Sequence, residues 1–210
     1  MQEFLSQNSL ILPETIVESG WLGHAPFAFH LISALDPKVF VELGTHNGFS
    51  YFCFCQAIKK HDLRTESFAV DTWVGDKHAG FYEESVFESV SRINERYSGF
   101  SQLVRSTFSE AVSQFSDGYI DLLHIDGRHF YEDAKSDFEE WLPKLSKNAI
   151  FLFHDTEVRE RDSGVWKLFD ERSQKYPSFN FHRQHGLGVL VLVGLLPRQS
   201  NAPVRQAGSL

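Results

Sequence analysis

The stretch KVFVELGTHNGFSYFCFCQAIKK, residues 38–60, contains the first unit of the predicted fold. Its apolar run KVFVELG (38–44) is typical of a strand that is covered on both faces. The run FSYFCFCQAIKK (49–60), which follows Gly48, is compatible with a helix. A strand that passes through a glycine turn into a helix is the beginning of a βαβ unit, so the stretch predicts a parallel α/β architecture.

The same alternation of strand and helix continues along the chain. Four more strand-like runs end in turn residues: SFAVDTW (67–73), SQLVRS (101–106), YIDLLHIDG (119–127) and AIFLFHD (149–155). Helix-compatible runs cover 83–98, 131–145 and 164–176. Two last runs, FNFHRQ (179–184) and GVLVLVG (188–194), are too close in sequence for a crossover and predict an antiparallel hairpin. We therefore expect an α/β, Rossmann-like doubly wound sheet of five parallel strands plus a C-terminal antiparallel hairpin, with helices on both faces.

Length and composition predict one globular domain of 210 residues. We divide it into an N-terminal helical segment (1–36), a main domain (37–195) and a mobile tail (196–210). The net charge of −8 and the lack of a basic run argue against binding to nucleic acid. No apolar stretch approaches the ~20 residues that a membrane span needs, and no signal peptide is visible. Cys53 and Cys55 fit buried thiols in a reducing compartment, so a cytoplasmic location is expected.

The ends of the first two strands carry the residue types of a ligand site. Ligands of open α/β sheets bind beyond the carboxyl ends of the strands. Gly44 and Gly48 let a ligand approach a helix N-terminus, although a purely structural glycine turn is an equal alternative. The dinucleotide fingerprint is absent, because its second and third glycines would fall on His46 and Phe49. Asp71 ends the second strand, where an acid can accept hydrogen bonds from a ribose diol.

Taken together, these features resemble a class I S-adenosylmethionine-dependent methyltransferase. The resemblance covers about residues 20–195, in VELGTHNGFSY, DTWVGDKHAGFYEE, TFSEA, IDLLHIDGRHFYEDAKSDFEEWLPKL, LFHD and HGLGVLV. More narrowly, these segments are similar to a bacterial family that is often found beside or fused to glycosyltransferases. That family is related to catechol-type and macrolide-sugar O-methyltransferases.

The resemblance implies a set of cofactor contacts. From the methionine end to the adenine of S-adenosylmethionine, the expected contacts are Glu42, Gly44, Gly48, Ser50, Asp126, Asp71, Thr72, Thr107 and Phe108. Glu42 to Ser50 would line the methionine end, and Asp71 would hold the ribose hydroxyls. The family's glycine before the adenine segment is Ser106 in this chain.

The resemblance also implies a divalent cation, magnesium, manganese or another, held by Asp126, His154 and Asp155. Such a cation gathers the acceptor's oxygens and lowers the pKa of the oxygen that is methylated. A carboxylate is expected where His154 stands, and one imidazole favours manganese, iron or zinc over magnesium. The alternative is that Asp126 and Asp155 only cap the helices that follow them.

His129 has the position, three residues after Asp126, that the macrolide-sugar relatives use for a general base. An imidazole suits that role because its pKa lies near neutral pH. Asp126 and His129 are therefore the expected catalytic residues. His124 is expected to be a hydrogen-bonded core histidine, with support for Asp126 as its alternative role.

Two loops near the expected site have open roles. Asp76, Lys77 and His78 could form a lid or an ordinary solvated loop. His185 could stabilise the hairpin turn or face the substrate.

The sequence therefore predicts an O-methyltransferase that acts on a hydroxyl of a sugar or glycoconjugate. The alternatives are a nicotinamide-dependent oxidoreductase and a non-catalytic, cofactor-binding partner of a glycosyltransferase. The expected ligands are S-adenosylmethionine and a small-molecule or glycan substrate. A homo-oligomer and an association with a glycosyltransferase are left open.

Overall fold

The computed structural model describes residues 10–76, 80–160 and 162–193. The expected tail (196–210), together with Lys77 and His78 of the expected lid, lies outside the described residues.

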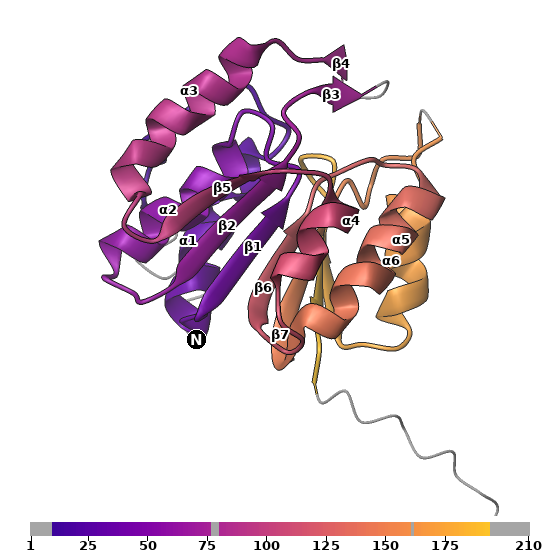
Figure 1. Cartoon of the computed structure of the whole chain (residues 1–210). Helices are drawn as coiled ribbons and strands as arrows, with labels where there is room; N and C mark the ends of the chain where they lie inside the picture. The colour runs from indigo at the N-terminus through magenta and orange to yellow at the C-terminus, as the bar shows by residue number, and fades with distance from the viewer. Residues whose placement is uncertain (1–9, 77–79, 161, 194–210) are drawn as a thin grey trace, which may run out of the picture.

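A seven-stranded sheet forms the centre of the molecule, with the strand order β5-β2-β1-β6-β7-β9-β8 (Figure 1). Its strands are β1 (Val39–Leu43), β2 (Glu66–Asp71), β5 (Ser101–Arg105), β6 (Ile120–Ile125), β7 (Leu145–His154), β8 (Ser178–Phe181) and β9 (Leu187–Val191). The five strands from β5 to β7 are parallel, and β9 runs antiparallel to both β7 and β8. The predicted sheet of five parallel strands with a terminal hairpin is confirmed. A separate two-stranded ribbon joins β3 (Gly75–Asp76) and β4 (Gly80–Phe81).

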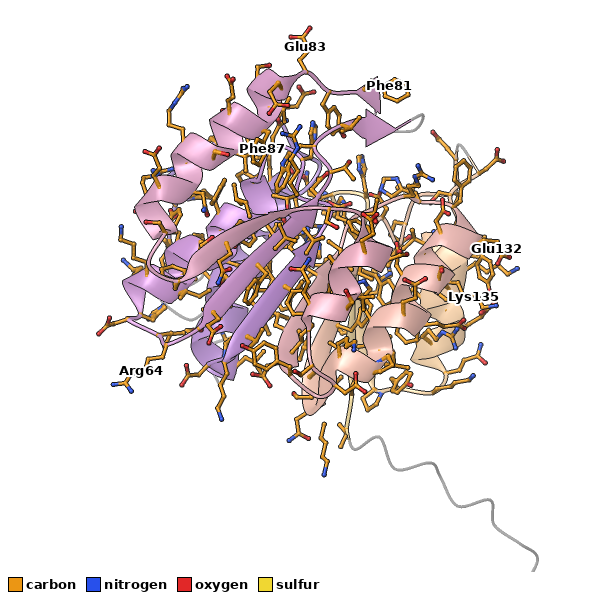
Figure 2. The ribbon with its side chains drawn as sticks, in the orientation of Figure 1. Arg64, Phe81, Glu83, Phe87, Glu132 and Lys135 are labelled. Atoms are coloured by element: carbon orange, nitrogen blue, oxygen red, sulfur yellow. The ribbon has the colours of Figure 1, made fainter. Side chains whose placement is uncertain are left out.

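Helices cover both faces of the sheet, as predicted (Figure 1). They are α1 (Ala25–Leu35), α2 (Phe49–Lys60), α3 (Glu84–Asn94), α4 (Phe108–Ala111), α5 (Tyr131–Trp141) and α6 (Val165–Ser173). The first three pack on one face and the last three on the other. Strand residues alternate between the two cores, so that Phe40 belongs to the first and Val39 and Val41 to the second. Glu132 and Lys135 of α5 point outward from the molecule (Figure 2).

The order of the strands reverses between β1 and β6. The chain moves outward from β1 through β2 to β5 and then returns to β6 on the other side of β1. The carboxyl ends of the two strands are level, because Leu43 lies beside Ile125. This is the switch point at which open α/β sheets place a ligand crevice.

The N-terminal segment differs from the helical segment expected for residues 1–36. Within its described part, helical structure covers Leu10, η2 (Leu22–His24) and α1, while residues 11–20 form no helix. We call residues 11–20 the N-terminal strap. The Gln56 side chain of α2 holds it, accepting from the Glu14 backbone N–H at 2.8 Å and donating to the Leu12 carbonyl at 3.0 Å. These bonds to α2 take the place of helical hydrogen bonds in the strap.

None of the helices in the described ranges is both long enough and apolar enough to cross a membrane.

Candidate active site

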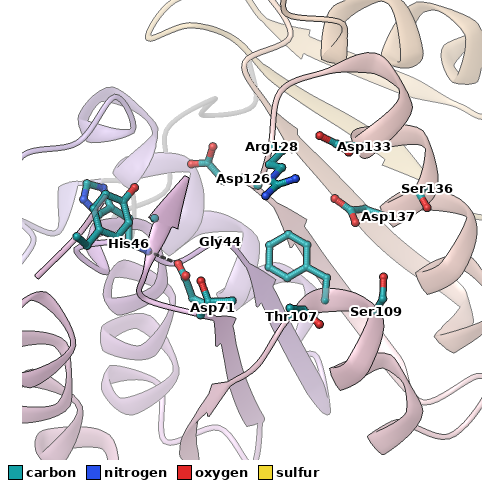
Figure 3. Close-up of a pocket in the computed structure, with 15 residues that line it drawn as sticks. Gly44, His46, Asp71, Thr107, Ser109, Asp126, Arg128, Asp133, Ser136 and Asp137 are labelled. Atoms are coloured by element: carbon teal, nitrogen blue, oxygen red, sulfur yellow. Dashed lines mark hydrogen bonds between the residues drawn. The ribbon is translucent and has the colours of Figure 1, made fainter. Parts of the chain in front are cut away.

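Two adjoining cavities open at the carboxyl ends of β1, β2, β6 and β7. The first cavity has a volume of about 360 Å³ and the second about 220 Å³. Both are lined by Gly44, His46, Tyr82, Asp126 and Gly127, which we call the shared floor. The first cavity continues along Asp71, Thr72, Gly75, Thr107, Phe108, Ser109, Arg128, Asp133, Ser136 and Asp137 (Figure 3). The second continues along Glu18, Ser19, Gly20, Thr45, Asn47, Gly48, Phe49, Ser50, His129, His154, Asp155 and His185.

Gly44 brings the ends of β1 and β6 into contact at the shared floor. Its φ of +88° lies in the left-handed region, and a Cβ there would stand 2.1 Å from the carbonyl oxygen of Asp126. Any side chain would force the two strand ends apart. The glycine is therefore required by this backbone approach.

Asp71 lies at the end of β2 and holds the loop that follows β1. Its Oδ2 accepts from the backbone N–H groups of Thr45 and His46, both at 2.9 Å, and its Oδ1 accepts from the Trp73 N–H at 2.8 Å. Oδ1 therefore retains acceptor capacity toward the first cavity. Within this loop, the His46 ring stacks on the Tyr82 ring with 4.3 Å between the ring centroids.

Glu42 lines neither cavity, although it was expected at the methionine end of the cofactor. It is completely buried and lies 2.8 Å from Nδ1 of His124, which is also completely buried. Burial raises the pKa of Glu42, and the contact with His124 opposes that rise. We call Glu42 and His124 the sealed pair. The prediction of a hydrogen-bonded core histidine is confirmed, but its partner is Glu42 and not Asp126.

A second group of histidines and carboxylates faces the second cavity. This open cluster consists of Asp126, His129, His154, Asp155 and His185. Nε2 of His129 lies 3.1 Å from Asp155 Oδ2 and 3.6 Å from Asp126 Oδ1. Nδ1 of His154 lies 3.1 Å from Asp126 Oδ1 and 3.2 Å from Asp155 Oδ1. The structure therefore brings together the expected base and the expected metal ligands.

Opposite charges dominate the electrostatics of the open cluster. Burial lowers the pKa of His154, but the charge of Asp126 and its hydrogen bond outweigh burial and raise it to about 9. Burial raises the pKa of Asp126, yet the nearby His154 and His129 hold it well below its usual value. The pKa of His129 is raised in net, since Asp126 and Asp155 outweigh its burial. The cluster thus stabilises positive charge at its edge toward the cavity.

The donor set of the open cluster fits a divalent cation. Asp155 Oδ1 is buried and makes no hydrogen bond to any described residue. Two sets of ligand atoms converge within 4.8 Å: Asp126 with His129 and Asp155, and His154 with Asp155 and His185. The expected set of Asp126, His154 and Asp155 is neither of these two sets: its members are divided between them, with His129 completing the first and His185 the second. Mixed imidazole and carboxylate donors suit manganese, iron or zinc.

Helix capping does not explain the two aspartates. The residues before α5 and α6 are Phe130 and Gly164, and neither helix start has a side-chain cap. The carboxylates of Asp126 and Asp155 instead contact histidines of the open cluster. The alternative that these aspartates only cap helices is wrong.

Unfavourable backbone conformations gather around the cavities. Eight described non-glycine residues have a positive φ, and five of them line or adjoin the cavities: His46, Trp73, Asp155, Gln184 and His185. Each such residue costs on the order of 1 kcal/mol, and conformations of this kind concentrate at functional sites. In this conformation the carbonyl oxygen of Gln184 lies 3.2 Å from Nε2 of His24 and 3.1 Å from Nε2 of His154.

Several cavity residues were not predicted from the sequence. They are His46, Tyr82, Arg128, Asp133, Ser136 and Asp137, together with Glu18 to Gly20 of the N-terminal strap. Asp133 and Asp137 lie one helical turn apart on α5, a spacing that places both side chains on the same side of the helix. This spacing is a sequence signal that could have pointed to the pair.

The family described as "Methyltransferase domain" matches residues 41–156, which is more than half of the chain. The chain belongs to this methyltransferase family. It is a class I S-adenosylmethionine-dependent methyltransferase, and this membership sets aside the nicotinamide-dependent alternative. The matched region contains the shared floor, the sealed pair and four of the five residues of the open cluster.

Solved structures show the same fold at low sequence identity. A methyltransferase from Geobacter sulfurreducens is 15% identical, covers 85% of this chain and 82% of its own, and has a TM-score of 0.63. The O-methyltransferase TomG from Streptomyces achromogenes, solved with S-adenosylmethionine, gives 15% identity, 87% and 84% coverage, and a TM-score of 0.60. The methyltransferase PaMTH1 from Podospora anserina, solved with S-adenosylhomocysteine, is 13% identical, covers 83% of this chain and 79% of its own, and has a TM-score of 0.61.

A relative in Sinorhizobium fredii, "Uncharacterized protein y4gI", is 58% identical over 172 residues. The match covers 82% of this chain but 19% of that protein, so the chain spans about a fifth of its relative's length.

Proposed function

We propose that the protein is an O-methyltransferase that methylates a hydroxyl of a sugar or glycoconjugate, with His129 as the general base. The observation that carries the proposal is the position of His129. Its Nε2 lies 3.1 Å from Asp155 at the second cavity, which shares its floor with the first cavity. An imidazole ring that is held by a carboxylate therefore lies beside a space for a cofactor.

The two cavities fit the two ends of the cofactor. Asp71, Thr72, Thr107 and Phe108 line the first cavity and would hold the adenosyl end. Gly44, Gly48 and Ser50 line the second, where the methionine end would lie. Glu42 would act from beneath this loop rather than by direct contact. When bound, S-adenosylmethionine supplies a methyl group on a positively charged sulfur.

Within this arrangement His129 would take the proton of the acceptor hydroxyl. Asp126 and Asp155 flank its Nε2, orient the ring and stabilise the imidazolium that forms. A divalent cation held by Asp126, Asp155 and a histidine of the open cluster would lower the pKa of the same hydroxyl. Because His129 belongs to one of the two converging ligand sets, a cation that recruits it would replace its role as base.

The lining of the second cavity favours a polyol as the acceptor. Among the described residues that line it, none has an aliphatic side chain. Phe49 and Tyr82 supply its phenyl and phenol rings, and Glu18, Asn47 and His185 add hydrogen-bonding groups. A catechol would need flat apolar walls, whereas a sugar uses polar groups together with one or two rings. The O-methyltransferase TomG, which has the same fold, supports hydroxyl chemistry.

An association with a glycosyltransferase remains part of the proposal. The Sinorhizobium fredii relative, in which the matched region is a fifth of a longer chain, supports only the point that such a domain occurs within a larger protein. Purification of the protein with a glycosyltransferase from the same cell would test this point separately from the chemistry.

The test is methyl transfer from isotopically labelled S-adenosylmethionine to a panel of glycosides, followed by mass spectrometry of the products. His129→Ala should lower kcat by about 100-fold or more and change the affinity for S-adenosylhomocysteine by less than about 2-fold. His182→Ala is the matched control, because His182 is an exposed histidine outside both cavities. It should leave both values unchanged.

Three results would contradict the proposal. Full turnover in His129→Ala would remove the base assignment. Labelled methyl on nitrogen or carbon would remove the hydroxyl acceptor. A wild-type protein that binds S-adenosylhomocysteine but methylates no glycoside would favour the non-catalytic partner.

A further inference from the structure

One of the two converging ligand sets of the open cluster does not include the proposed general base. It consists of His154 and Asp155 at the end of β7 and His185 in the turn between β8 and β9, and we call it the hairpin set. The other set includes His129. A cation in the hairpin set would therefore leave His129 outside the metal site.

The carboxylate oxygen Oδ1 of Asp155 is the common neighbour of the two imidazoles in the hairpin set. It lies 3.2 Å from Nδ1 of His154 and 3.5 Å from Nδ1 of His185. Ligand atoms that are held about 2.0–2.1 Å from a zinc ion at tetrahedral angles lie ~3.3 Å apart, so both distances suit one shared ion. The side chain of Asp155 is only 7% exposed, and its Oδ1 makes no hydrogen bond to any described residue. This buried oxygen is therefore available as a ligand.

The ring of His154 is oriented as in a metal ligand. Its Nε2 lies 3.1 Å from the carbonyl oxygen of Gln184, which can only accept, so Nε2 carries a hydrogen. Nδ1 then faces the carboxylates of Asp126 and Asp155, where only a proton or a cation relieves the repulsion between its lone pair and their oxygens. Histidines that bind metals commonly donate their other ring N–H to a backbone carbonyl, and the metal displaces the proton from the ligating nitrogen.

Gly20 of the N-terminal strap keeps the space beside the hairpin set open. A Cβ at this position would stand 3.0 Å from Nδ1 of His185 and 3.5 Å from Cε1 of His154. The φ of Gly20 is not in the left-handed region, so the backbone conformation does not require a glycine here. Gly20 and all three members of the hairpin set line the second cavity. The missing side chain therefore leaves room for an ion at the wall of this cavity.

We propose that the hairpin set binds one divalent transition-metal ion, such as zinc, through Nδ1 of His154, Oδ1 of Asp155 and Nδ1 of His185. Two imidazoles and one carboxylate are a suitable donor set for such an ion, and three protein ligands leave a further position for an oxygen atom. His185 takes the place of Asp126 in the set expected from the sequence, so Asp126 remains a neighbour of His129. The site itself rests on these contacts, whereas its role, to hold an oxygen of the acceptor, rests on the proposed function.

The test is a calorimetric titration with zinc chloride after the protein has been dialysed against EDTA and then against buffer. The wild-type protein should bind one zinc ion per chain. His185→Ala removes a ligand and Gly20→Val fills the space beside it, so each should weaken zinc binding by about 10-fold or more. His129→Ala should change the affinity by less than about 2-fold. His182→Ala is the matched control and should do the same, since His182 is an exposed histidine of the same turn and lies 2.8 Å from a carboxylate oxygen of Glu157.

Two further measurements keep the result interpretable. Thermal melts without zinc would show that each variant is folded. An anomalous difference map from crystals grown with zinc should show one peak about 2.0–2.1 Å from the three ligand atoms of the hairpin set.

The outcomes separate this inference from the proposed function. A loss of zinc affinity in His129→Ala but not in His185→Ala would overturn the inference, because the ion would then occupy the other set. Equal losses in His185→Ala and His182→Ala would also overturn it, since zinc would then bind to surface histidines in general. A wild-type protein that binds no zinc overturns the inference but leaves methyl transfer with His129 as base, which needs no ion. A protein that binds zinc as expected but methylates no glycoside would overturn the proposed function alone.

Discussion

The sealed pair and the open cluster both combine carboxylates with histidines, but they differ in their access to a cavity. Glu42 and His124 face each other on neighbouring strands and are completely buried. Asp126 and Asp155 stand just beyond the ends of β6 and β7, where their histidine contacts border a cavity. Two residues along the chain, from His124 to Asp126, separate a completely buried contact from one that borders a cavity. Position relative to the strand end decides whether such a contact is enclosed in the core or faces a cavity.

The largest expected effect on stability comes from breaking the sealed pair. Glu42→Ala should lower the free energy of unfolding by about 3–5 kcal/mol, because His124 would remain buried without its partner. Urea denaturation would measure the loss. Replacing both residues together, by Glu42→Met with His124→Leu, should recover much of it. A loss below about 1 kcal/mol in Glu42→Ala would mean that the pair is not structural.

In the open cluster, a substitution should lower turnover strongly and change the free energy of unfolding little. Asp155→Asn keeps the size of the side chain and tolerates the φ of +62°, so unfolding should change by less than about 1.5 kcal/mol. Turnover should fall by about 100-fold, because His129 loses its carboxylate contact at 3.1 Å. Parallel kinetics and urea denaturation would check both values. A stability loss as large as that of Glu42→Ala would erase the difference between the two groups.

Asp137 provides an effect that depends on pH. Its pKa is raised to about 7 by burial and by Asp133 and Glu140, against Arg128. Between its ordinary pKa near 3.8 and about 7, the folded protein holds a proton that the unfolded chain has lost, so stability falls as pH rises through this window. Asp137→Asn removes this unfavourable contribution. Thermal melts should show a larger gain in Tm at about pH 8 than at about pH 4, and equal gains would contradict the assignment.

The smallest expected effect is that of His185→Ala. His185 is well exposed and lies 3.5 Å from Asp155 at the edge of the second cavity. Its removal should change the free energy of unfolding by less than about 0.5 kcal/mol. It should raise KM for the acceptor while sparing the affinity for S-adenosylhomocysteine. Steady-state kinetics would measure KM for the acceptor, and calorimetry would measure the affinity for S-adenosylhomocysteine. A changed cofactor affinity with an unchanged KM would contradict the placement of His185 beside the acceptor.

Much of the fold was predictable because apolar strands and amphipathic helices leave a clear pattern. The run at 49–60 coincides with α2, and Asp126 and Asp155 stand at the strand ends where they were expected. The burial of Glu42 was not predictable, since its place in the chain is equally consistent with a ligand contact. It depends on which face of β1 is covered by α1 and α2. The non-glycine residues with a positive φ and the path of the N-terminal strap likewise depend on tertiary contacts, which leave no local sequence pattern.

The most direct test of the account is a crystal structure with bound S-adenosylhomocysteine. We expect the sulfur to lie at the shared floor beside Gly44 and Asp126, with His129 facing it across the second cavity. The adenine should lie along Thr107 and Phe108 in the first cavity. A sulfur located away from the shared floor, or an open cluster separated from it by other side chains, would contradict the assignment of this cluster as the site of methyl transfer.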